Sequence, residues 1–269
     1  MISVGVDVGS TTIKVVIVED GVVRRRRIVP SGNLPARTAA ETLDAVLAED
    51  GRSRADADVI ATTGYGRRLV DFGDTVMTEI KACALGVRHA TPPDAGVRTI
   101  LDVGGQDTKV IALADDGEVE DFGMNDKCAA GTGRFLEMLA HKLELPYETF
   151  VEDALASETP LQMNSTCAVF AESEVVGLLA RGEAKGDIAA AAHDAIAGRV
   201  SSMLRRVGQR PAYCFVGGGA HNRALVKAIE EHLGEPVLIP EDAQAVVALG
   251  AAVGAADRLR RQQARDTDA

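Results

Sequence analysis

The sequence contains no tryptophan, and aromatic residues make up only 3% of its 269 residues. Proteins that bind single-stranded nucleic acid commonly stack bases on aromatic side chains, so this scarcity argues against such a platform. The cores must be built mainly from alanine, valine, leucine and isoleucine, because apolar residues still amount to 46% of the chain. At roughly 100 to 200 residues per domain, the length fits one large domain or two modest ones.

Positive charge is also in short supply. Lysine and arginine total 29 against 40 aspartate and glutamate residues, which gives a formal net charge of −11. This balance argues against nucleic acid and anionic membrane surfaces as partners. The start, MISVGVDVGS, lacks the basic residues of a secretory signal, and the most apolar late segment, AQAVVALGAAVGAAD, is too short to span a bilayer. We therefore expect a cytoplasmic protein without membrane contact.

Cysteine is rare too, with only Cys83, Cys128, Cys167 and Cys214 present. In a reducing compartment these do not form a disulfide framework, so each is a core residue, a reactive thiol or a metal ligand. Cys83 falls in a predicted amphipathic helix and Cys214 in an apolar strand, which favours a core position for both. The five histidines show no metal-ligand spacing, and we assign them no role.

What the chain does contain is an internal repeat. The segment VDVGSTTIKVVIVEDG near the N-terminus is matched from residue 101 by LDVGGQDTKVIALADDG. An apolar strand, a tight glycine-containing turn and a second strand are expected in each copy. Two similar halves therefore open with the same β-hairpin. The matched residues, each 95 positions apart, are Asp7 and Asp102, Gly9 and Gly104, and Lys14 and Lys109.

Helical and strand patterns alternate along the rest of the chain. This alternation predicts an α/β protein with mixed sheets. A break at TPPDAG sets the boundary between predicted domains 1–97 and 98–269, with the last helix free to return to the first domain. The polar end, RLRRQQARDTDA, is expected to fray. Strands are expected in ADVIATTGYG, AYCFVGGG and EPVLIP, and helices in RTAAETLDAVLAE, TEIKACALGVRHA, GTGRFLEMLAHKLEL, AVFAESEVVGLLARG, GDIAAAAHDAIAGRVSSMLRRVG and NRALVKAIEEHLG.

Each hairpin combines aspartate, glycine and small hydroxyl residues. Glycine lets backbone N–H groups approach a phosphate closely, and the carboxylate at the base of the hairpin can hold Mg²⁺ through water. Gly217, Gly218 and Gly219 follow an apolar strand and precede the helix that opens at Asn222, an arrangement expected near a nucleoside. Any one of these pieces alone is more often a simple tight turn. Together they predict a nucleotide site.

Duplicated Asp-x-Gly hairpins followed by a late GGG resemble the superfamily of acetate and sugar kinases, heat-shock ATPases and actin, over nearly the whole chain. The resemblance implies two ribonuclease H-like domains with a nucleotide cleft between them. It places Asp7 and Asp102 around Mg²⁺ and makes Gln106 the candidate for orienting the attacking water. The ATP-binding residues that it implies are Gly9, Ser10, Thr11, Thr12, Lys14, Gly104, Gly105, Asp107, Gly217, Gly218, Gly219, Asn222 and Gln244.

Two of the cysteines share a local pattern. Cys128 ends NDKC and Cys167 ends NSTC, and each precedes a predicted helix. A helix N-terminus carries about half a positive charge, which favours thiolates and any anionic centre that they bind. Two thiolates are too few for an iron–sulfur cluster or a structural zinc, which commonly take four ligands, so a two-fold axis would have to supply the second pair. From spacing alone, two buried or merely reactive thiols remain the alternative.

Longer motifs narrow the resemblance. ATTGYGR, LDVGGQDTKVI, MNDKCAAGTGRFLEMLA and STCAVFAESEVVGLLARG are similar to the ATP-dependent activators of 2-hydroxyacyl-CoA dehydratases and the related ATPase subunits of benzoyl-CoA reductase. The resemblance implies a homodimer with one 4Fe-4S cluster between its subunits, held by Cys128 and Cys167. It also implies that ATP hydrolysis drives a low-potential electron into the dehydratase, with a ferredoxin or flavodoxin as the electron donor.

Other interpretations stay open. A benzoyl-CoA reductase ATPase subunit would pair with a non-identical subunit, and a small-molecule kinase of the same superfamily would use the same phosphate loops without a reason for the paired cysteines. A non-catalytic scaffold would not need both aspartates. The arginine run from Arg24 to Arg27 would suit an acidic electron donor, although an edge strand that faces water is the simpler interpretation. The sequence identifies neither the acyl-CoA substrate nor the donor.

Overall fold

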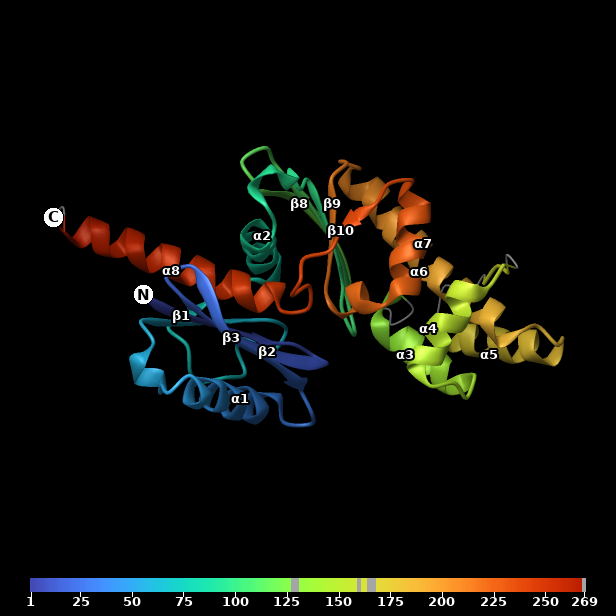
Figure 1. Ribbon diagram of the computed structural model, residues 1–269, viewed down its shortest axis with the longest axis horizontal. Helices are drawn as coiled ribbons and strands as arrows, with labels where there is room; N and C mark the ends of the chain where they lie inside the picture. Colours follow the sequence, from blue (N-terminus) through green and yellow to red (C-terminus); the bar gives the residue numbers. More distant parts are fainter. Residues whose placement is uncertain (127–130, 159–160, 164–167, 268–269) are drawn as a thin grey trace. The chain divides into compact units, whose positions relative to one another are not determined.

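The computed structural model describes residues 1–126, 131–158, 161–163 and 168–267 (Figure 1). The chain divides into two compact units. The first comprises Met1–Gly96, Asp116–Val119 and Pro240–Ala269, and the second comprises Val97–Asp115 and Glu120–Ile239. The C-terminal segment therefore groups with the N-terminal sheet and not with the second half of the sequence.

The first unit is built on a five-stranded mixed sheet with the order β3-β2-β1-β4-β5. β1, β2 and β3 form an antiparallel meander, while β4 pairs in parallel with β1 and β5. Asp20 and Gly21 turn the chain between β2 and β3, with φ angles of 50° and 83°, and positive φ at both positions is what a type I′ hairpin turn requires. The strands are β1 Ile2–Val8, β2 Thr12–Glu19, β3 Val22–Pro30, β4 Val59–Thr63 and β5 Thr75–Val76.

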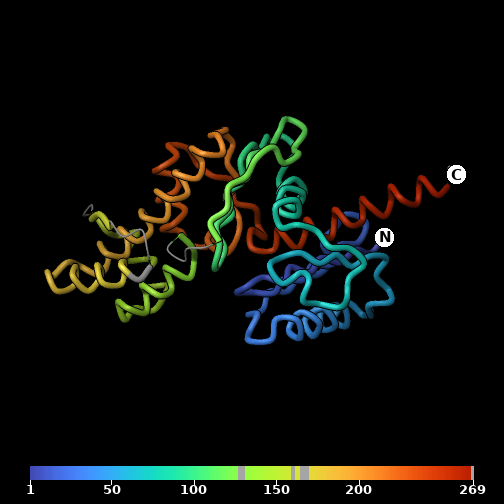
Figure 2. Tube along the Cα trace, turned by 180° about the vertical axis from the view of Figure 1, so that it is seen from behind, coloured from blue at the N-terminus to red at the C-terminus, as the bar shows by residue number. Residues whose placement is uncertain are grey.

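Helices cover both faces of this sheet. α1 (Pro35–Glu49) packs its buried leucines against Val4, Val6 and Val8 of β1. Side chains alternate along a strand, so Gly5 lies on the other face, where α2 (Glu79–Ala90) and α8 (Val246–Thr267) cover the sheet. α8 thus completes the core of the first unit from the far end of the sequence (Figure 2).

Three glycines allow α2, α8 and β1 to approach one another closely. A Cβ atom at Gly5 would lie 1.9 Å from a backbone oxygen of α8, and one at Gly86 would lie 2.0 Å from another. A Cβ at Gly250 of α8 would lie 1.7 Å from a backbone oxygen of α2. Real Cβ atoms do not come this close to backbone, so any larger side chain at these positions would force the elements apart.

The second unit has a sheet of the same design, with the order β10-β9-β6-β7-β8. β6 and β7 form an antiparallel hairpin, and β9 pairs in parallel with both β6 and β10. The first three strands and the parallel strand that follows repeat the arrangement of β1 to β4 in the first unit. The strands are β6 Thr99–Val103, β7 Thr108–Leu113, β8 Val119–Asn125, β9 Tyr213–Val216 and β10 Val237–Leu238.

Five α-helices lie within the described residues of the second unit. The long helix α6 packs against both α4 and α7, with buried Ile188, Ile196 and Leu204 among the residues of its inner face. A short 3₁₀ segment, Gly218–His221, joins β9 to α7. The helices are α3 Gly133–Lys142, α4 Tyr147–Ala156, α5 Ala168–Ala180, α6 Lys185–Val207 and α7 Arg223–Leu233.

The predicted α/β class is confirmed, because both described sheets mix parallel and antiparallel strands and carry helices. α4 has no counterpart among the predicted helices. The expectation that RLRRQQARDTDA frays is wrong, since α8 continues to Thr267. Alanine, glutamine and arginine are good helix formers, and cations near a helix C-terminus interact favourably with its dipole. Of the helices that the structure describes, none combines the length and apolarity needed to cross a membrane.

Candidate nucleotide site

The first phosphate-loop candidate is the turn between β1 and β2. Lys14 Nζ donates a hydrogen bond to Asp7 Oδ2 at 2.8 Å, and the two residues are direct partners in the antiparallel ladder. A Cβ atom at Gly9 would lie 2.6 Å from the carbonyl oxygen of Thr12, so only glycine fits there. Ser10 at the tip of the turn is exposed. The hairpin therefore holds a carboxylate and an ammonium group together beneath an accessible glycine turn.

Two buried hydroxyls, one in this turn and one at the end of β4, are suited to bind a ligand. Ser31 fixes the turn, because its Oγ donates to the Gly9 carbonyl at 2.7 Å and its N–H donates to the Thr11 carbonyl at 2.9 Å. The hydroxyls of Thr11 and Thr63 are buried and have no hydrogen-bond partner within the described residues. Such groups destabilise a protein unless a ligand or water satisfies them, so they fit phosphate oxygens or Mg²⁺-bound water.

The residue that follows β4 packs directly on the Asp7 carboxylate. Gly64 has φ of 90°, and a Cβ there would lie 2.4 Å from Asp7 Oδ1 and 2.6 Å from the Val8 carbonyl oxygen. Gly66 packs in the same way on Val8, where its Cβ would lie 2.6 Å from Cγ1. The sequence suggested no role for these glycines beyond a turn. Their position against Asp7 and Val8 makes them part of the wall of the site.

The second unit repeats the ion pair and adds a carboxylate. Lys109 is 3% exposed, and its Nζ lies 3.5 Å from Asp102 Oδ2 and 2.7 Å from Asp107 Oδ2. Asp102 and Lys109 are ladder partners, as Asp7 and Lys14 are. A buried ammonium group between two carboxylates fixes the orientation of both of them. Lys109 is thus a site residue to which the sequence assigned no role beyond its place in the repeat.

The GGG segment holds the position in the second unit that Gly64 to Gly66 hold in the first. Gly217 has φ of 84°, and a Cβ there would lie 2.5 Å from Asp102 Oδ1. A Cβ at Gly219 would lie 2.8 Å from Val103 Cβ, while Gly218 between them is exposed. Of the three predicted nucleoside-binding glycines, two therefore pack on the strand that carries Asp102. Only Gly218 presents an open backbone surface.

The turn after β6 is tied to the start of α3. Gly104 N–H donates to the Asp107 carbonyl at 2.9 Å, which closes the turn, and Gln106 at its tip is exposed. The N–H of Gly133 donates to the Gly104 carbonyl at 2.9 Å, and that of Arg134 donates to the Gly105 carbonyl at 3.1 Å. The first amides of α3 are thus directed at the phosphate loop, a connection that the sequence did not reveal.

Asn222 serves first as a structural cap. Its Oδ1 accepts the Leu225 N–H at 3.0 Å at the start of α7, and its Nδ2 donates to Tyr147 Oη at 3.0 Å and to His193 Nε2 at 2.9 Å. His193 Nδ1 donates in turn to the Ala189 carbonyl at 2.7 Å. The side chain of Asn222 is therefore already engaged within the protein and is not free for the predicted nucleotide contact.

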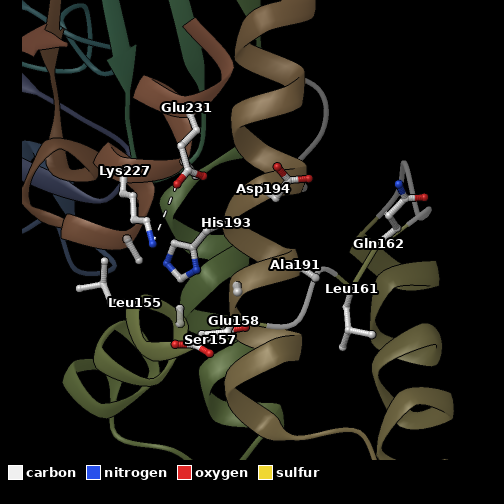
Figure 3. A pocket seen from close by; sticks show the side chains of 14 residues that line it. Leu155, Ser157, Glu158, Leu161, Gln162, Ala191, His193, Asp194, Lys227 and Glu231 are labelled. Atoms are coloured by element: carbon white, nitrogen blue, oxygen red, sulfur yellow. Dashed lines mark ion pairs between the residues drawn. The ribbon is translucent and has the colours of Figure 1, made fainter. Parts of the chain in front are cut away.

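His193 lies beside a cavity of about 350 Å³ that is lined by the end of α4, by α6 and by α7 (Figure 3).

Burial lowers the pKa of His193 from 6.5 to about 4. The unfolded chain therefore takes up a proton at this residue that the folded chain excludes, so stability falls as the pH drops from about 6.5 to about 4. At about 1.4 kcal/mol per pKa unit, the loss amounts to about 3 kcal/mol. We expect urea unfolding at a series of pH values to show it. His193→Gln should make the profile shallower in this window, whereas His89→Gln, on the exposed side of α2, should not. Equal slopes in the native chain and His193→Gln would contradict this.

Gln244 and the arginine run are the remaining predicted contacts. Gln244 is half-buried in the turn before α8, in the first unit. The four arginines of the edge strand β3 are each paired with a carboxylate of the same unit, so they are not a free basic surface. The pairs are Arg24 with Glu19 at 3.3 Å, Arg25 with Asp50 at 3.7 Å, Arg26 with Asp242 at 2.6 Å, and Arg27 with Glu49.

The predicted cluster ligands, Cys128 and Cys167, lie outside the described residues. Cys83 and Cys214 are both fully buried, and burial raises the pKa of Cys214 to about 12, so this thiol stays protonated. Their predicted core positions are confirmed. Across the described ranges, no group of three or more His, Cys, Asp or Glu side chains is placed to hold a metal ion. Asp7 and Asp102 each offer one carboxylate, which suits Mg²⁺ bound through water.

Known proteins resemble this chain along most of its length. The profile of the BadF/BadG/BcrA/BcrD ATPase family matches residues 4–255. The (R)-2-hydroxyglutaryl-CoA dehydratase activating ATPase of Acidaminococcus fermentans is 39% identical over 256 residues, which cover 93% of this chain and 95% of that protein. A benzoyl-CoA reductase subunit of Thauera aromatica is 29% identical over 241 residues, with coverage of 87% and 84%.

Solved structures show the same similarity. The activator of the 2-hydroxyisocaproyl-CoA dehydratase from Clostridium difficile, with bound ADPNP, matches with a TM-score of 0.89 at 35% identity and covers 98% of each chain. A ROK hexokinase from Thermus thermophilus matches with a TM-score of 0.51 at 16% identity, covering 97% of this chain and 100% of that one. The second match shows a shared fold alone.

Proposed function

Because the chain belongs to the BadF/BadG/BcrA/BcrD ATPase family, we propose that it hydrolyses ATP to deliver a low-potential electron from a 4Fe-4S cluster to a 2-hydroxyacyl-CoA dehydratase. The observation that carries the ATPase part is the duplicated site. Each unit sets an Asp–Lys pair under a glycine turn and backs the carboxylate with a positive-φ glycine. The acyl-CoA part rests on relatives that are named as dehydratase activators.

In this proposal the two glycine turns bind the phosphates through backbone N–H groups. Asp7 and Asp102 hold Mg²⁺-bound water, and the hydroxyls of Thr11 and Thr63 gain the partners that they lack. ATP supplies the phosphoanhydride bond, whose hydrolysis releases the free energy. Gln106 is exposed at the tip of its turn, where its amide is free to orient the attacking water.

The cluster is proposed to lie between two copies of the chain, bound by Cys128 and Cys167 of each. α5, which begins directly after Cys167, supports a partner at this place. Its sequence, AVFAESEVVGLLA, is mainly apolar on either side of Glu172, Ser173 and Glu174, and Phe170 and Val176 are 69% and 48% exposed. Large apolar side chains that are exposed on a helix favour burial against a partner, so a second α5 is a fitting cover for them.

The link between the two sites is proposed to run through α3. Its first amides bind the carbonyls of Gly104 and Gly105, and Thr108 Oγ1 donates to the Gly131 carbonyl at 2.5 Å, three residues after Cys128. A change in the phosphate loop must therefore move or break hydrogen bonds of the segment that follows the cysteine. Such coupling is reciprocal. If bound nucleotide changes the reduction equilibrium of the cluster by some factor, reduction of the cluster changes the nucleotide affinity by the same factor.

We expect the cluster potential and the hydrogen exchange of α3 to differ between the nucleotide-free, MgADP and MgATP-mimic states. For one electron, about 59 mV corresponds to a tenfold change in the reduction equilibrium. Thr108→Val should reduce the nucleotide-dependent difference in exchange, because it removes the hydroxyl, and Thr108→Ser should retain it. Identical potentials together with identical exchange in all three states would contradict the coupling, because ATP would have no state to select.

The partner is proposed to be a 2-hydroxyacyl-CoA dehydratase, with a ferredoxin or flavodoxin as electron donor. The alternative is an ATPase subunit of a benzoyl-CoA reductase, which the 29% identity to the Thauera aromatica protein supports. The two differ in assembly, since the alternative needs a non-identical second subunit. Because the arginines of β3 are already paired with carboxylates, they give little support to donor docking on that strand.

Anaerobic purification of this chain alone tests the proposal. Iron, acid-labile sulfide and oligomeric mass should be measured on the same preparation. About four irons and four sulfides per two chains are expected, with loss of both on exposure to air, because a site on a dimer axis is accessible. A folded monomer that hydrolyses MgATP but contains no iron would keep the ATPase assignment and reject the electron-transfer role.

A further inference from the structure

A basic groove lies between α2 and the C-terminal half of α8 in the first unit. The groove has a volume of about 750 Å³ and is lined by α2, α8, β5 and the turn at Glu118. Met77 and Leu85 form an apolar floor. Gly254 of α8 packs closely on both, since a Cβ there would lie 2.6 Å from Leu85 Cδ1 and from Met77 Cε. Figure 1 shows this half of α8 extending past the rest of the first unit. We call this feature the α2–α8 groove.

Cations line both sides of the α2–α8 groove in helical register. Lys81 and Arg88 lie seven residues apart on α2, and Arg258, Arg261 and Arg265 recur at intervals of three and four on α8. Residues with these spacings lie on one face of a helix. At 1.5 Å per residue, each row is about 10 Å long. Glu118, Asp257 and Asp266 also line the groove, so its five cations exceed its carboxylates by two, in a chain whose formal net charge is −11.

Most of this charge has no internal counter-charge. Within the described residues, no carboxylate lies within 4.0 Å of Lys81, Arg261 or Arg265, and Arg258 Nη1 contacts only the Thr75 hydroxyl, at 3.1 Å. Arg88 has one long contact, 3.9 Å to Glu118. The four arginines of β3 in the same unit are each paired. The contrast suggests that an external anion neutralises the groove.

We propose that the α2–α8 groove binds an extended acidic segment of a partner protein. Two rows of about 10 Å match three residues of extended chain at about 3.3 Å each, whereas a single phosphate would need cations that converge on one point. Arginine clusters are a recurring means of recognising acidic motifs. The apolar floor of Met77 and Leu85 adds room for one hydrophobic side chain of the segment. The site involves none of the residues proposed to bind nucleotide.

The test uses the full chain and a fluorescein-labelled hexaglutamate peptide, with a hexaglutamine peptide as neutral control. Fluorescence anisotropy at low salt should show saturable binding of hexaglutamate alone, unchanged by saturating MgADP. Arg261→Glu with Arg265→Glu should weaken binding at least tenfold. The matched control is Arg206→Glu with Arg37→Glu, which makes the same charge change at two exposed arginines that do not line the groove and should change affinity less than twofold. MgATP hydrolysis and thermal unfolding should be the same in both double variants.

Equal weakening by both double variants would overturn the proposal, because binding would then follow net charge and not the groove. Absence of hexaglutamate binding would overturn it as well. Inorganic pyrophosphate serves as a competitor. If it displaces the peptide at concentrations well below those of unlabelled hexaglutamate, the groove is a site for small phosphorylated ligands and the acidic-segment assignment fails. Each of these results is independent of the cluster and of the proposed acyl-CoA partner.

Discussion

Asp102→Ala is expected to lower MgATP turnover about 100-fold or more while the chain stays folded. Loss of one group that stabilises the charge of the transition state, directly or through Mg²⁺, commonly costs two to three orders of magnitude in turnover. Removal of one partner of a buried ion pair usually costs about 3 to 5 kcal/mol, because the other charge is left alone. Here Lys109 keeps Asp107 at 2.7 Å, so that cost is largely avoided. Phosphate release and thermal unfolding, measured together, check both parts.

In the part of the chain that the structure describes, the Asp–Lys pair of the first unit lacks the additional carboxylate that Asp107 provides in the second. Asp7→Ala should also abolish most turnover, but it should destabilise the chain more than Asp102→Ala. Lys14 has no second carboxylate within 4.0 Å among the described residues. Asp115→Ala, whose side chain is 91% exposed, is the matched control and should alter neither property. A folded Asp102→Ala chain with native hydrolysis would reject the site, and a need for an added phosphate acceptor would favour the kinase alternative.

Cys128→Ser and Cys167→Ser are each expected to abolish iron binding, whereas Cys83→Ala and Cys214→Ala should keep the native iron content. A 4Fe-4S cluster on a two-fold axis would lose two of its four ligands through either serine substitution. The control cysteines are fully buried, and alanine is a small apolar replacement that suits such positions. Iron and sulfide per chain, determined under anaerobic conditions, give the result. Loss of iron in folded Cys83→Ala or Cys214→Ala would exclude the two-fold arrangement.

The hairpin repeat could be predicted because its chemistry is local. A tight turn between two strands that pair an Asp with a Lys limits which residue types fit at a few neighbouring positions. The same pattern is therefore visible in the sequence twice, with Asp7 and Lys14 and with Asp102 and Lys109. The helices could be predicted for the same reason, from spacing along one segment. The resemblance to the activator family also came from local motifs, and the comparisons confirm the family.

The equivalence of Gly64 and Gly217 was not predicted, because it depends on tertiary packing and not on similar local sequence. Gly64 and Gly217 occupy equivalent positions against Asp7 and Asp102, yet Thr63 before the first glycine corresponds to Val216 before the second. Nor does local sequence show which distant carboxylates pair with an arginine. The partners of the β3 arginines include Asp242, far along the chain. The link from Gly104 to Gly133 depends equally on tertiary packing.

The packing of α8 onto β1 has a consequence for the order in which the chain acquires its structure. β1 is synthesised first, but α8, which packs directly on Gly5 and shares this face of the sheet with α2, begins only at Val246. Contacts between segments so far apart form late, because the intervening chain must first be brought into place. The second unit lies between them in sequence and can fold before the first is complete. Until α8 is synthesised, the N-terminal sheet therefore has one apolar face only partly covered, by α2, and such exposed apolar surface makes the nascent chain prone to aggregation.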